Sequence, residues 1–316
     1  MTDPFPSIPA STPREAGVCA VVVTWQPDLA ILGGLLSALV PQVANVVLVD
    51  NGTRDPGLRD LCTEHSVATV LELPENHGLA HALNVGMAHA RGLPGTSHIL
   101  LMDQDSVPEP GMVGALKAAL DRKAAGGRVA AVGPCFRDSR EASDAPFVRI
   151  RFPFNRKIRC NGACETIRCD LLISSGCLIP LAVIDEVGGM DAALFIDNVD
   201  LDWCFRATAA GYELHGVCAA RLRHNLGETR QHVPGVPRAI VVHPPRRLFY
   251  MMRNRLLLYR RAYTPTRWIA QDLPRLAVKF LLFALLVPPR RANLRCMLAG
   301  MRSGLAGHAS PPPDDA

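Results

Sequence analysis

Two aspartates in the stretch Met102-Asp103-Gln104-Asp105-Ser106 have the spacing of a metal site. They directly follow an apolar run, so both carboxylates turn toward one point where that run ends. Hard oxygen ligands suit Mg²⁺ or Mn²⁺, which complete their shells with phosphate oxygens and water. Such a cation would neutralise the charge that develops on a nucleoside-diphosphate leaving group. The alternative is an acidic turn that caps the next helix, so the pattern alone is weak.

Three further acids, Asp197, Asp200 and Asp202, lie next to Trp203 at the expected start of a helix. Aspartates are common at helix starts because they interact favourably with the helix dipole. Three of them beside a tryptophan also suggest a cleft, in which one carboxylate deprotonates a sugar hydroxyl as it attacks an anomeric carbon. A single displacement with one base inverts that carbon, by analogy with inverting glycosidases. These acids are the candidate catalytic residues.

Other polar residues lie at predicted strand ends and turns. Asp50 ends a strand, where it can accept a hydrogen bond from the imide N–H of uracil or thymine, although Asp-Asn-Gly is itself a common turn. Gly78 begins a helix whose N–H groups would face a phosphate, with Asn76 and Asn84 nearby. His224 is a candidate third metal ligand, although a lone histidine is more often an ordinary residue.

The elements that must position these residues alternate between strands and helices. β-Branched apolar runs predict the strands, and apolar residues at helical spacing predict the helices. The strands are expected at 18–24, 46–49, 67–73, 98–102, 129–132 and 213–218, and the helices at 28–40, 78–91, 108–125, 182–187 and 199–211. The alternation predicts an α/β fold with a doubly wound, mostly parallel sheet and helices on both faces. Ligands bind beyond the carboxyl ends of such strands, where Thr24, Asp50 and Asp103 fall.

The remaining chain divides by composition. Residues 134–170 are rich in arginine and irregular, so we expect a loop over the site. Between Arg230 and Arg302 there are fifteen Lys and Arg and one acid, Asp272. This basic part, with helices expected at 246–263 and 266–287, either lies on an anionic membrane surface or caps the sheet with its arginines in solvent. The expected divisions are a disordered lead at 1–16, a catalytic domain at 17–233, a basic helical segment at 234–302 and a disordered tail at 303–316.

The sequence favours a cytoplasmic protein, free or bound to the inner face of the membrane. Residues 1–16 lack the apolar region of a secretory signal, and the apolar run Leu276–Val287 is shorter than the ~20 residues of a membrane span. The ten cysteines are therefore expected to be reduced and mostly buried. Cys160, Cys164 and Cys169 lack the C-x2-C pair of a zinc site, so free thiols are favoured.

Several function classes are disfavoured by spacing. No G-x-G-x-x-G follows the first strand, and the chain contains neither a phosphate-binding P-loop nor a G-x-S-x-G nucleophile motif. Basic residues lie near aromatic ones at the C-terminal end, but no RNA-recognition pattern accompanies them, so we expect no nucleic-acid partner. The sequence does not indicate an oligomeric state.

The motifs taken together resemble family 2 glycosyltransferases of the GT-A fold, and most of all bacterial rhamnosyltransferases that use dTDP-L-rhamnose. The resemblance extends from about Val18 to Tyr263. It rests on V-V-V-T-W-Q-P, V-L-V-D-N-G, E-N-H-G-L-A-H-A-L-N-V-G, L-M-D-Q-D-S, S-S-G-C-L-I, F-I-D-N-V-D-L-D-W-C-F-R and R-R-L-F-Y-M-M-R-N-R. It implies a nucleotide-sugar donor, Mg²⁺ or Mn²⁺ as cofactor, and a lipid-linked or polymeric glycan acceptor.

The resemblance also assigns roles by position. Asp103, Asp105 and the late histidine, His224, would hold the metal. The family has Glu-Asp where this chain has Val199-Asp200, so Asp200 would be the base, with Asp197 as the alternative. Ser175, Gly176 and Trp203 would lie on the acceptor side. The donor would be bound by Thr24, Trp25, Asp50, Asn51, Asn76, Gly78, Asn84, Asp103 and Gln104.

We therefore expect inverting transfer of a deoxyhexose, L-rhamnose, from dTDP to a hydroxyl of a growing glycan or glycolipid. Another pyrimidine-nucleotide donor such as a UDP-hexose is the nearest alternative. A sugar-1-phosphate nucleotidyltransferase is disfavoured because the loop after the first strand, Thr24 to Asp28, has neither glycine nor a basic residue. A non-catalytic membrane-associated assembly protein is disfavoured by the intact acidic motifs.

Overall fold

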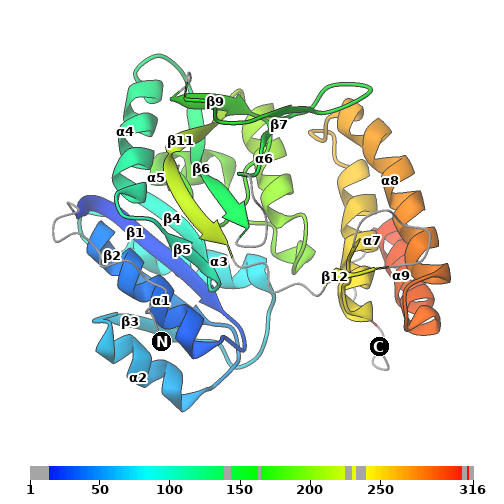
Figure 1. The fold of residues 1–316 in the computed structure, drawn as a ribbon, viewed down its shortest axis with the longest axis horizontal. Coiled ribbons are helices and arrows are strands. Elements are labelled where there is room, and N and C mark those ends of the chain that lie inside the picture. The colour runs from blue at the N-terminus through cyan, green and yellow to red at the C-terminus, as the bar shows by residue number, and fades with distance from the viewer. Residues whose placement is uncertain are drawn as a thin grey trace.

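The computed structural model describes residues 14–138, 144–162, 165–224, 230–232, 240–307 and 312. An α/β body occupies one side of the molecule and three C-terminal helices occupy the other (Figure 1). A nine-stranded sheet runs through the body in the order β3-β2-β1-β4-β10-β6-β11-β5, with β9 paired to β11.

The first half of the sheet is parallel, as the sequence predicts. It consists of β1 (Glu15–Thr24), β2 (Val43–Asp50), β3 (Thr69–Glu72) and β4 (His98–Asp103). The central strands are buried on both faces, which explains their continuous apolar sequences. The carboxyl ends of all four strands consequently lie along one edge.

The second half of the sheet is mixed, so the expectation of a mostly parallel sheet holds only for the first half. β10 (Cys177–Pro180) runs antiparallel to both of its neighbours, β4 and β6 (Val129–Asp138). β11 (Glu213–His224) is parallel to β6, whereas β5 (Ser106–Pro108) and β9 (Thr166–Cys169) are antiparallel to β11.

Helices cover both faces of the sheet, as predicted. On one face α1 (Leu29–Leu39), α2 (Pro56–Glu64) and α4 (Met112–Ala124) share a hydrophobic core with the even-numbered residues of β1. On the other face α3 (Leu79–Arg91), α5 (Leu181–Val187) and α6 (Val199–Ala209) share a core with the odd-numbered ones. The alternation follows from the two-residue period of a strand. α3 lies especially close, because a Cβ on Gly86 would approach the Val21 side chain to 2.3 Å.

Two expectations for the middle of the chain are wrong. The segment 134–170 is not an irregular loop, because β6 continues to Asp138 and the segment also forms a hairpin of β7 (Phe147–Arg149) and β8 (Arg156–Ile158), followed by β9. Cys160 and Cys218 are not free thiols, because they form a disulfide. The fold brings two residues 58 positions apart onto adjacent elements, which local spacing does not reveal. Seven other cysteines are free and buried as expected, and Cys164 lies outside the described residues.

The C-terminal segment forms three helices rather than the two expected: α7 (Pro245–Tyr259), α8 (Thr266–Leu285) and α9 (Arg290–Ala306). α9 passes residue 303, where the sequence predicts a tail, and β1 likewise begins within the predicted lead. α9 crosses α7 closely, because a Cβ on Gly300 would lie 2.3 Å from the Phe249 carbonyl. A short pair, β12 (Arg230–Gln231) and β13 (Ile240–Val241), precedes these helices.

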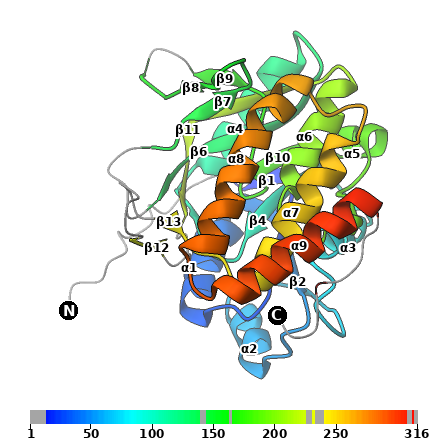
Figure 2. The ribbon, with the colours of Figure 1, turned by 90° about the vertical axis from the view of Figure 1, so that its right-hand side faces the viewer.

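α8 and α9 form the outer wall on this side of the molecule (Figure 2). Trp268 of α8 meets Phe205 of α6 edge to face, with their ring centroids 5.3 Å apart, so the helices share a core with the α/β body. Within the described part of the chain, no helix combines the length and apolar character that a membrane span requires.

Candidate active site

Three predicted site residues lie side by side at the carboxyl edge of the parallel strands. Thr24 of β1 pairs with Asp50 of β2, and the preceding Val23 pairs with Asp103 of β4. The backbone N–H of Asn51 donates to the Thr24 carbonyl over 2.8 Å. Thr24 and Asp50 are buried, whereas Asp103 is partly exposed.

Gln104 ties the loop after β4 to the loop after β1. Its Oε1 accepts from the Trp25 backbone N–H over 2.7 Å, and its Nε2 donates to the Trp25 carbonyl over 3.2 Å. The backbone N–H of Gln26 donates to Oγ1 of Thr53, in the loop after β2, over 2.8 Å. The three loops are therefore joined, and the Trp25 side chain remains 49% exposed beside them.

The carboxylate of Asp50 stabilises the turn that follows it. Its carboxylate accepts from the backbone N–H of Thr53 over 3.2 Å and of Arg54 over 2.9 Å. This is the turn role that the sequence left open as the alternative to base recognition. Recognition of a pyrimidine by Asp50 remains a prediction.

Asn51 and Asn76 bind each other at the start of α3. Asn51 Nδ2 donates to Asn76 Oδ1 over 3.0 Å, and the same oxygen accepts from the Gly78 N–H over 2.9 Å. Gly78 has a φ of +86°, and a Cβ there would approach the Phe195 ring to 2.6 Å. The backbone N–H of Ala80 donates to the Phe195 carbonyl over 3.2 Å. Gly78 therefore allows residues 194–198, which we call the acidic loop, to pack closely on α3.

Asn84 binds the backbone of Met190 with both of its polar atoms. Its Nδ2 donates to the Met190 carbonyl and its Oδ1 accepts from the Met190 N–H, both over 2.8 Å. Since both polar atoms are taken by one backbone, Asn84 fixes the segment that leads into the acidic motif. The structure thus gives Asn84 a positioning role, and its predicted contact with the donor stays a prediction.

Asp103, Asp105 and Asp200 form an acidic centre between β4 and α6. Burial, with smaller contributions from the carboxylates of Asp105 and Asp200, raises the pKa of Asp103 to about 7. Burial likewise raises the pKa of Asp200 to about 6, and its Oδ1 accepts from the Leu201 N–H over 2.8 Å. The three acids that the sequence assigned to metal and base are thus within electrostatic reach of one another.

Ser174 is a site residue that the sequence reasoning missed. Its side chain hydrogen-bonds to Asp103, and its backbone hydrogen-bonds to Asp200. The predicted neighbour, Ser175, is buried, and its Oγ accepts from the Asp103 N–H over 3.3 Å. Gly176 has a φ of +79° and packs on Pro134, which identifies a turn rather than an acceptor surface. Ser174 and Ser175 both lie in this turn, and no local pattern in the sequence distinguishes the two serines.

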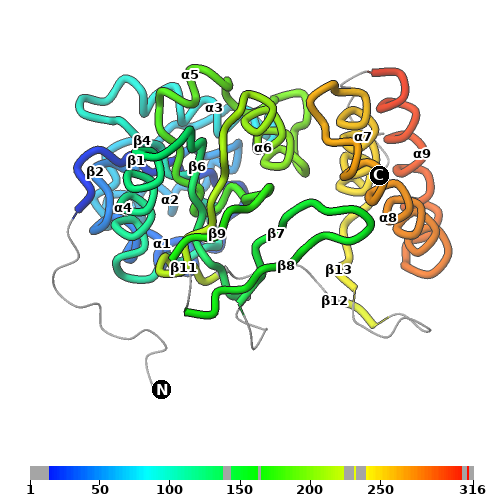
Figure 3. Tube along the Cα trace, turned by 90° about the horizontal axis from the view of Figure 1, so that it is seen from above, coloured from blue at the N-terminus to red at the C-terminus, as the bar shows by residue number. Residues whose placement is uncertain are grey.

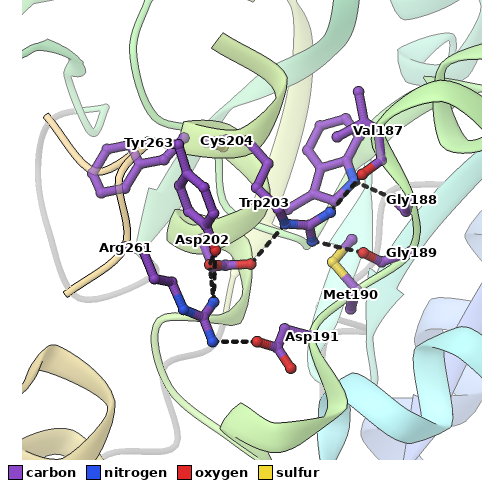
Figure 4. A network of polar contacts seen from close by, with 12 residues as sticks. Val187, Gly188, Gly189, Met190, Asp191, Asp202, Trp203, Cys204, Arg261 and Tyr263 are labelled. Carbon is purple, nitrogen blue, oxygen red and sulfur yellow. Dashed lines mark hydrogen bonds and ion pairs between the residues drawn. The ribbon is translucent and has the colours of Figure 1, made fainter. Parts of the chain in front are cut away.

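Asp202 and Trp203 are structural residues, which corrects their predicted roles. Asp202 is fully buried, accepts from Arg206 over 2.9 Å and from the Tyr263 hydroxyl over 2.7 Å, and pairs with Arg261 (Figure 4). Trp203 is 2% exposed, and its indole N–H donates to the Gly188 carbonyl over 3.0 Å. Both side chains point into the protein because α6 buries this face.

Asp197, the alternative base, forms an ion pair with Arg247 of α7 at 3.0 Å. It lies in an unusual loop, since Phe195, Asp197 and Asn198 all have φ between +63° and +65°. Non-glycine residues rarely adopt this conformation, and such strain is common at functional sites. Asp200 follows two residues later, so the conformation of this loop sets the position of the candidate base.

Two buried residues of α7 hold this loop in place. Asn254 Nδ2 donates to the carbonyls of Leu194, Ile196 and Asp197 over 2.7 to 2.9 Å. Arg253 Nη2 donates to the carbonyls of Ala193 and Leu194 over 2.6 and 3.1 Å. The C-terminal helices are therefore part of the active-site framework.

His224 has only its backbone described. It ends β11 and pairs with Ser106, the residue after Asp105. The strand register thus brings it next to the acidic centre, and its metal-binding role stays a prediction.

Known proteins resemble this chain in sequence. Residues 19–172 match the model of "Glycosyl transferase family 2". The chain is also 31% identical over 252 residues to "dTDP-rhamnosyl transferase RfbF" of Shigella flexneri, an alignment that covers 79% of this chain and 82% of that protein. The chain belongs to glycosyl transferase family 2.

Solved structures of other glycosyltransferases share the fold. GalNAc-T7, crystallised with UDP, GalNAc and Mn²⁺, superposes with a TM-score of 0.54 at 14% identity, over 66% of this chain and 44% of that one. TarS of S. aureus superposes with a TM-score of 0.51 at 12% identity, over 84% of this chain and 43% of that one. This chain spans less than half of either protein. The likeness confirms the predicted GT-A class, with a mixed sheet and helices on both faces.

The acidic centre of this family 2 enzyme fits a hard divalent cation. Burial, together with repulsion from Asp105 and Asp200, raises the pKa of Asp103 there. A cation between Asp103 and Asp105 would offset that repulsion. Among the side chains that the structure describes, no cluster of three His, Cys, Asp or Glu forms a complete metal site. The diphosphate of a donor would therefore have to complete the shell.

Proposed function

We propose that this protein is a metal-dependent, inverting glycosyltransferase that moves L-rhamnose from dTDP-L-rhamnose to a hydroxyl of a glycan or glycolipid. The observation that carries the chemistry is the electrostatic contact between Asp103, at the end of β4, and Asp200, at the start of α6. The similarity over 82% of a dTDP-rhamnosyl transferase supports the donor.

Each acid has one role in the proposed reaction. Asp103 and Asp105 hold Mg²⁺ or Mn²⁺, which stabilises the charge of the departing diphosphate when it is bound. Asp200 accepts the proton of the acceptor hydroxyl as its oxygen attacks the anomeric carbon from the side opposite the diphosphate. One displacement with one base inverts the configuration at that carbon. Ser174 orients both carboxylates, and the α7 residues Arg253 and Asn254 keep the acidic loop in position.

The proposed acceptor is a lipid-linked or polymeric saccharide in cell-surface polysaccharide synthesis. We place the enzyme in the cytoplasm, where it would meet such acceptors at the inner face of the membrane. The basic C-terminal helices are the proposed contact with that surface, and the charge of the segment supports this.

Slow hydrolysis of a panel of sugar nucleotides tests the donor directly, because it needs no acceptor. Purified enzyme with Mn²⁺ is expected to release dTDP from dTDP-L-rhamnose faster than it releases UDP from UDP-hexoses. Preference for a UDP-hexose would reassign the donor, and the absence of hydrolysis and of nucleotide binding throughout would support a non-catalytic protein.

A further inference from the structure

Exposed apolar side chains are concentrated on one side of the molecule. In the described part of the chain, eleven large apolar side chains are exposed, and all but Trp25 belong to the tip of the β7–β8 hairpin or to α8, α9 and the link between them. The ten are Phe152, Phe154, Leu273, Val278, Leu281, Leu285, Leu286, Leu294, Leu298 and Leu305. An apolar patch of this extent indicates an interaction surface.

The exposed residues of α8 form a continuous stripe. Trp268, Leu276 and Phe283 point inward and pack on the protein. The outward residues repeat every three or four positions over four turns, where a helix at a water interface normally carries polar side chains. The stripe consists of Ala270, Leu273, Pro274, Ala277, Val278, Leu281 and Leu285.

The hairpin tip adjoins this stripe. Gln271 of α8 donates from Nε2 to the Arg151 carbonyl at the tip, and the hairpin reaches toward α8 in Figure 3. Phe152 and Phe154 follow at once and are 65% and 80% exposed. We call Phe152, Phe154 and the α8 stripe the hairpin–α8 face.

The charge around this face is of one sign. Residues 145–162 contain five Lys and Arg and no acid. α8 adds Arg267, Arg275 and Lys279, and its one acid, Asp272, is buried and paired with Arg255 at 2.9 Å. Arg149 is paired with Asp170, and the other cations of these two segments attract anions without an exposed carboxylate in the same segments to repel them.

A cavity of about 520 Å³ opens beside the same face, between β13 and α8. Pro274 and Val278 belong to both the stripe and the cavity lining. Most of the lining is apolar, and Arg275 and Lys279 supply its cations. This hollow suits an alkyl chain that carries an anionic head.

We propose that the hairpin–α8 face docks onto an anionic lipid bilayer, with its phenylalanines and leucines at headgroup depth and its cations among the phosphates. The proposal deepens the proposed function by naming the surface that brings this active site to a lipid-linked acceptor. A second copy of the chain is a poorer partner, because it would oppose cations to cations. The position of this face relative to the active site is fixed, because α7, another of the three C-terminal helices, hydrogen-bonds to the loop before Asp200.

Vesicle flotation of the full chain tests the docking without a donor or acceptor. The wild type is expected to float with phosphatidylcholine vesicles that contain one-third phosphatidylglycerol, and to remain unbound with phosphatidylcholine alone. Phe152→Ser with Phe154→Ser removes two exposed rings and should weaken binding at least about tenfold. Arg156→Glu with Lys157→Glu should weaken it at least about 25-fold, from about fivefold for each cation lost near an anionic surface.

Arg122→Glu with Lys123→Glu on α4 is the matched control, because it makes the same charge change at another exposed Arg-Lys pair, on the side of the molecule away from α8. Its binding should stay within a few-fold of the wild type. The proposal would be overturned if this control lost vesicle binding equally, or if the wild type did not bind anionic vesicles. It would also be overturned if the wild type were a dimer that the phenylalanine variant converts to monomers. Hydrolysis of dTDP-L-rhamnose by the same variants reports the proposed function separately and should be unchanged.

Discussion

Replacing Asn254 with alanine is expected to displace the acidic loop, although Asn254 lies outside the acidic centre. The side chain of Asn254 is completely buried and touches no residue of the acidic centre. Its amide serves three carbonyls of the segment 194–197, two of whose residues have positive φ. In Asn254→Ala the carbonyls of Ile196 and Asp197 lose this donor, whereas that of Leu194 keeps its hydrogen bond from Arg253. Fewer hydrogen bonds then hold the loop in its strained conformation.

The magnitude follows from the number of contacts. The Asn254 amide has two N–H donors shared among the three carbonyls, so at about 1 kcal/mol net for each donor its loss corresponds to about 2 kcal/mol of stability. Relaxation of the loop would also shift Asp200, and a misplacement of about 1 Å in a reacting group costs roughly 100-fold in rate. We therefore expect kcat to fall about 100-fold in protein that is still folded.

The assay compares kcat with urea unfolding at a temperature where each variant is folded. Asn293→Ala is the matched control, since Asn293 is also buried and donates from Nδ2 to the Val287 carbonyl over 2.9 Å, within the helical segment and away from the acidic loop. It should lose stability and keep its kcat. If Asn254→Ala keeps kcat within twofold of the wild type, the loop does not depend on α7 and the reasoning is wrong.

Three other changes have definite expectations. Asp200→Asn should lower kcat by about 10²–10⁴-fold with donor affinity unchanged. In the wild type, kcat should fall as the pH drops below about 6, because burial raises the pKa of Asp200 to about 6 and protonation removes the base. A flat pH profile of kcat from pH 5 to 7 would reject this role. Arg261→Leu leaves the buried carboxylate of Asp202 without one of its partners and should cost about 3–5 kcal/mol in urea unfolding, whereas a loss below 1 kcal/mol would show the pair to be dispensable. Gly78→Ala places a Cβ 2.6 Å from the Phe195 ring at a φ of +86°, so lower stability and lower kcat are expected together, and wild-type values for both would contradict the packing.

The strands and their carboxyl ends were predictable because β-branched apolar runs and the acids that follow them are local signals. The positions of Asp103 and Asp105 follow from the predicted end of β4 alone, whereas the choice of Asp200 as the base depends on the family resemblance. Asp202 was misjudged because its role depends on Arg261, 59 positions away, and no local pattern shows that pairing.

The same limit explains the other corrections. Asn84 binds Met190 across 106 positions, and Cys160 meets Cys218 across 58, so each is a product of the fold rather than of its neighbours in sequence. The sequence of α9 is rich in arginine and small residues, so no local pattern predicts this helix, and only the fold shows that its glycines contact α7. The direction of β10 is likewise set by its neighbours β4 and β6.

Calorimetric titration of dTDP into the enzyme, with and without Mn²⁺, tests the central claim most directly. A cation held by Asp103 and Asp105 should tighten dTDP binding by at least about tenfold in the wild type, and this gain should vanish in Asp103→Ala and in Asp105→Ala while both variants remain folded. Equal affinity with and without the metal, or an unchanged gain in either variant, would contradict the assignment of these aspartates.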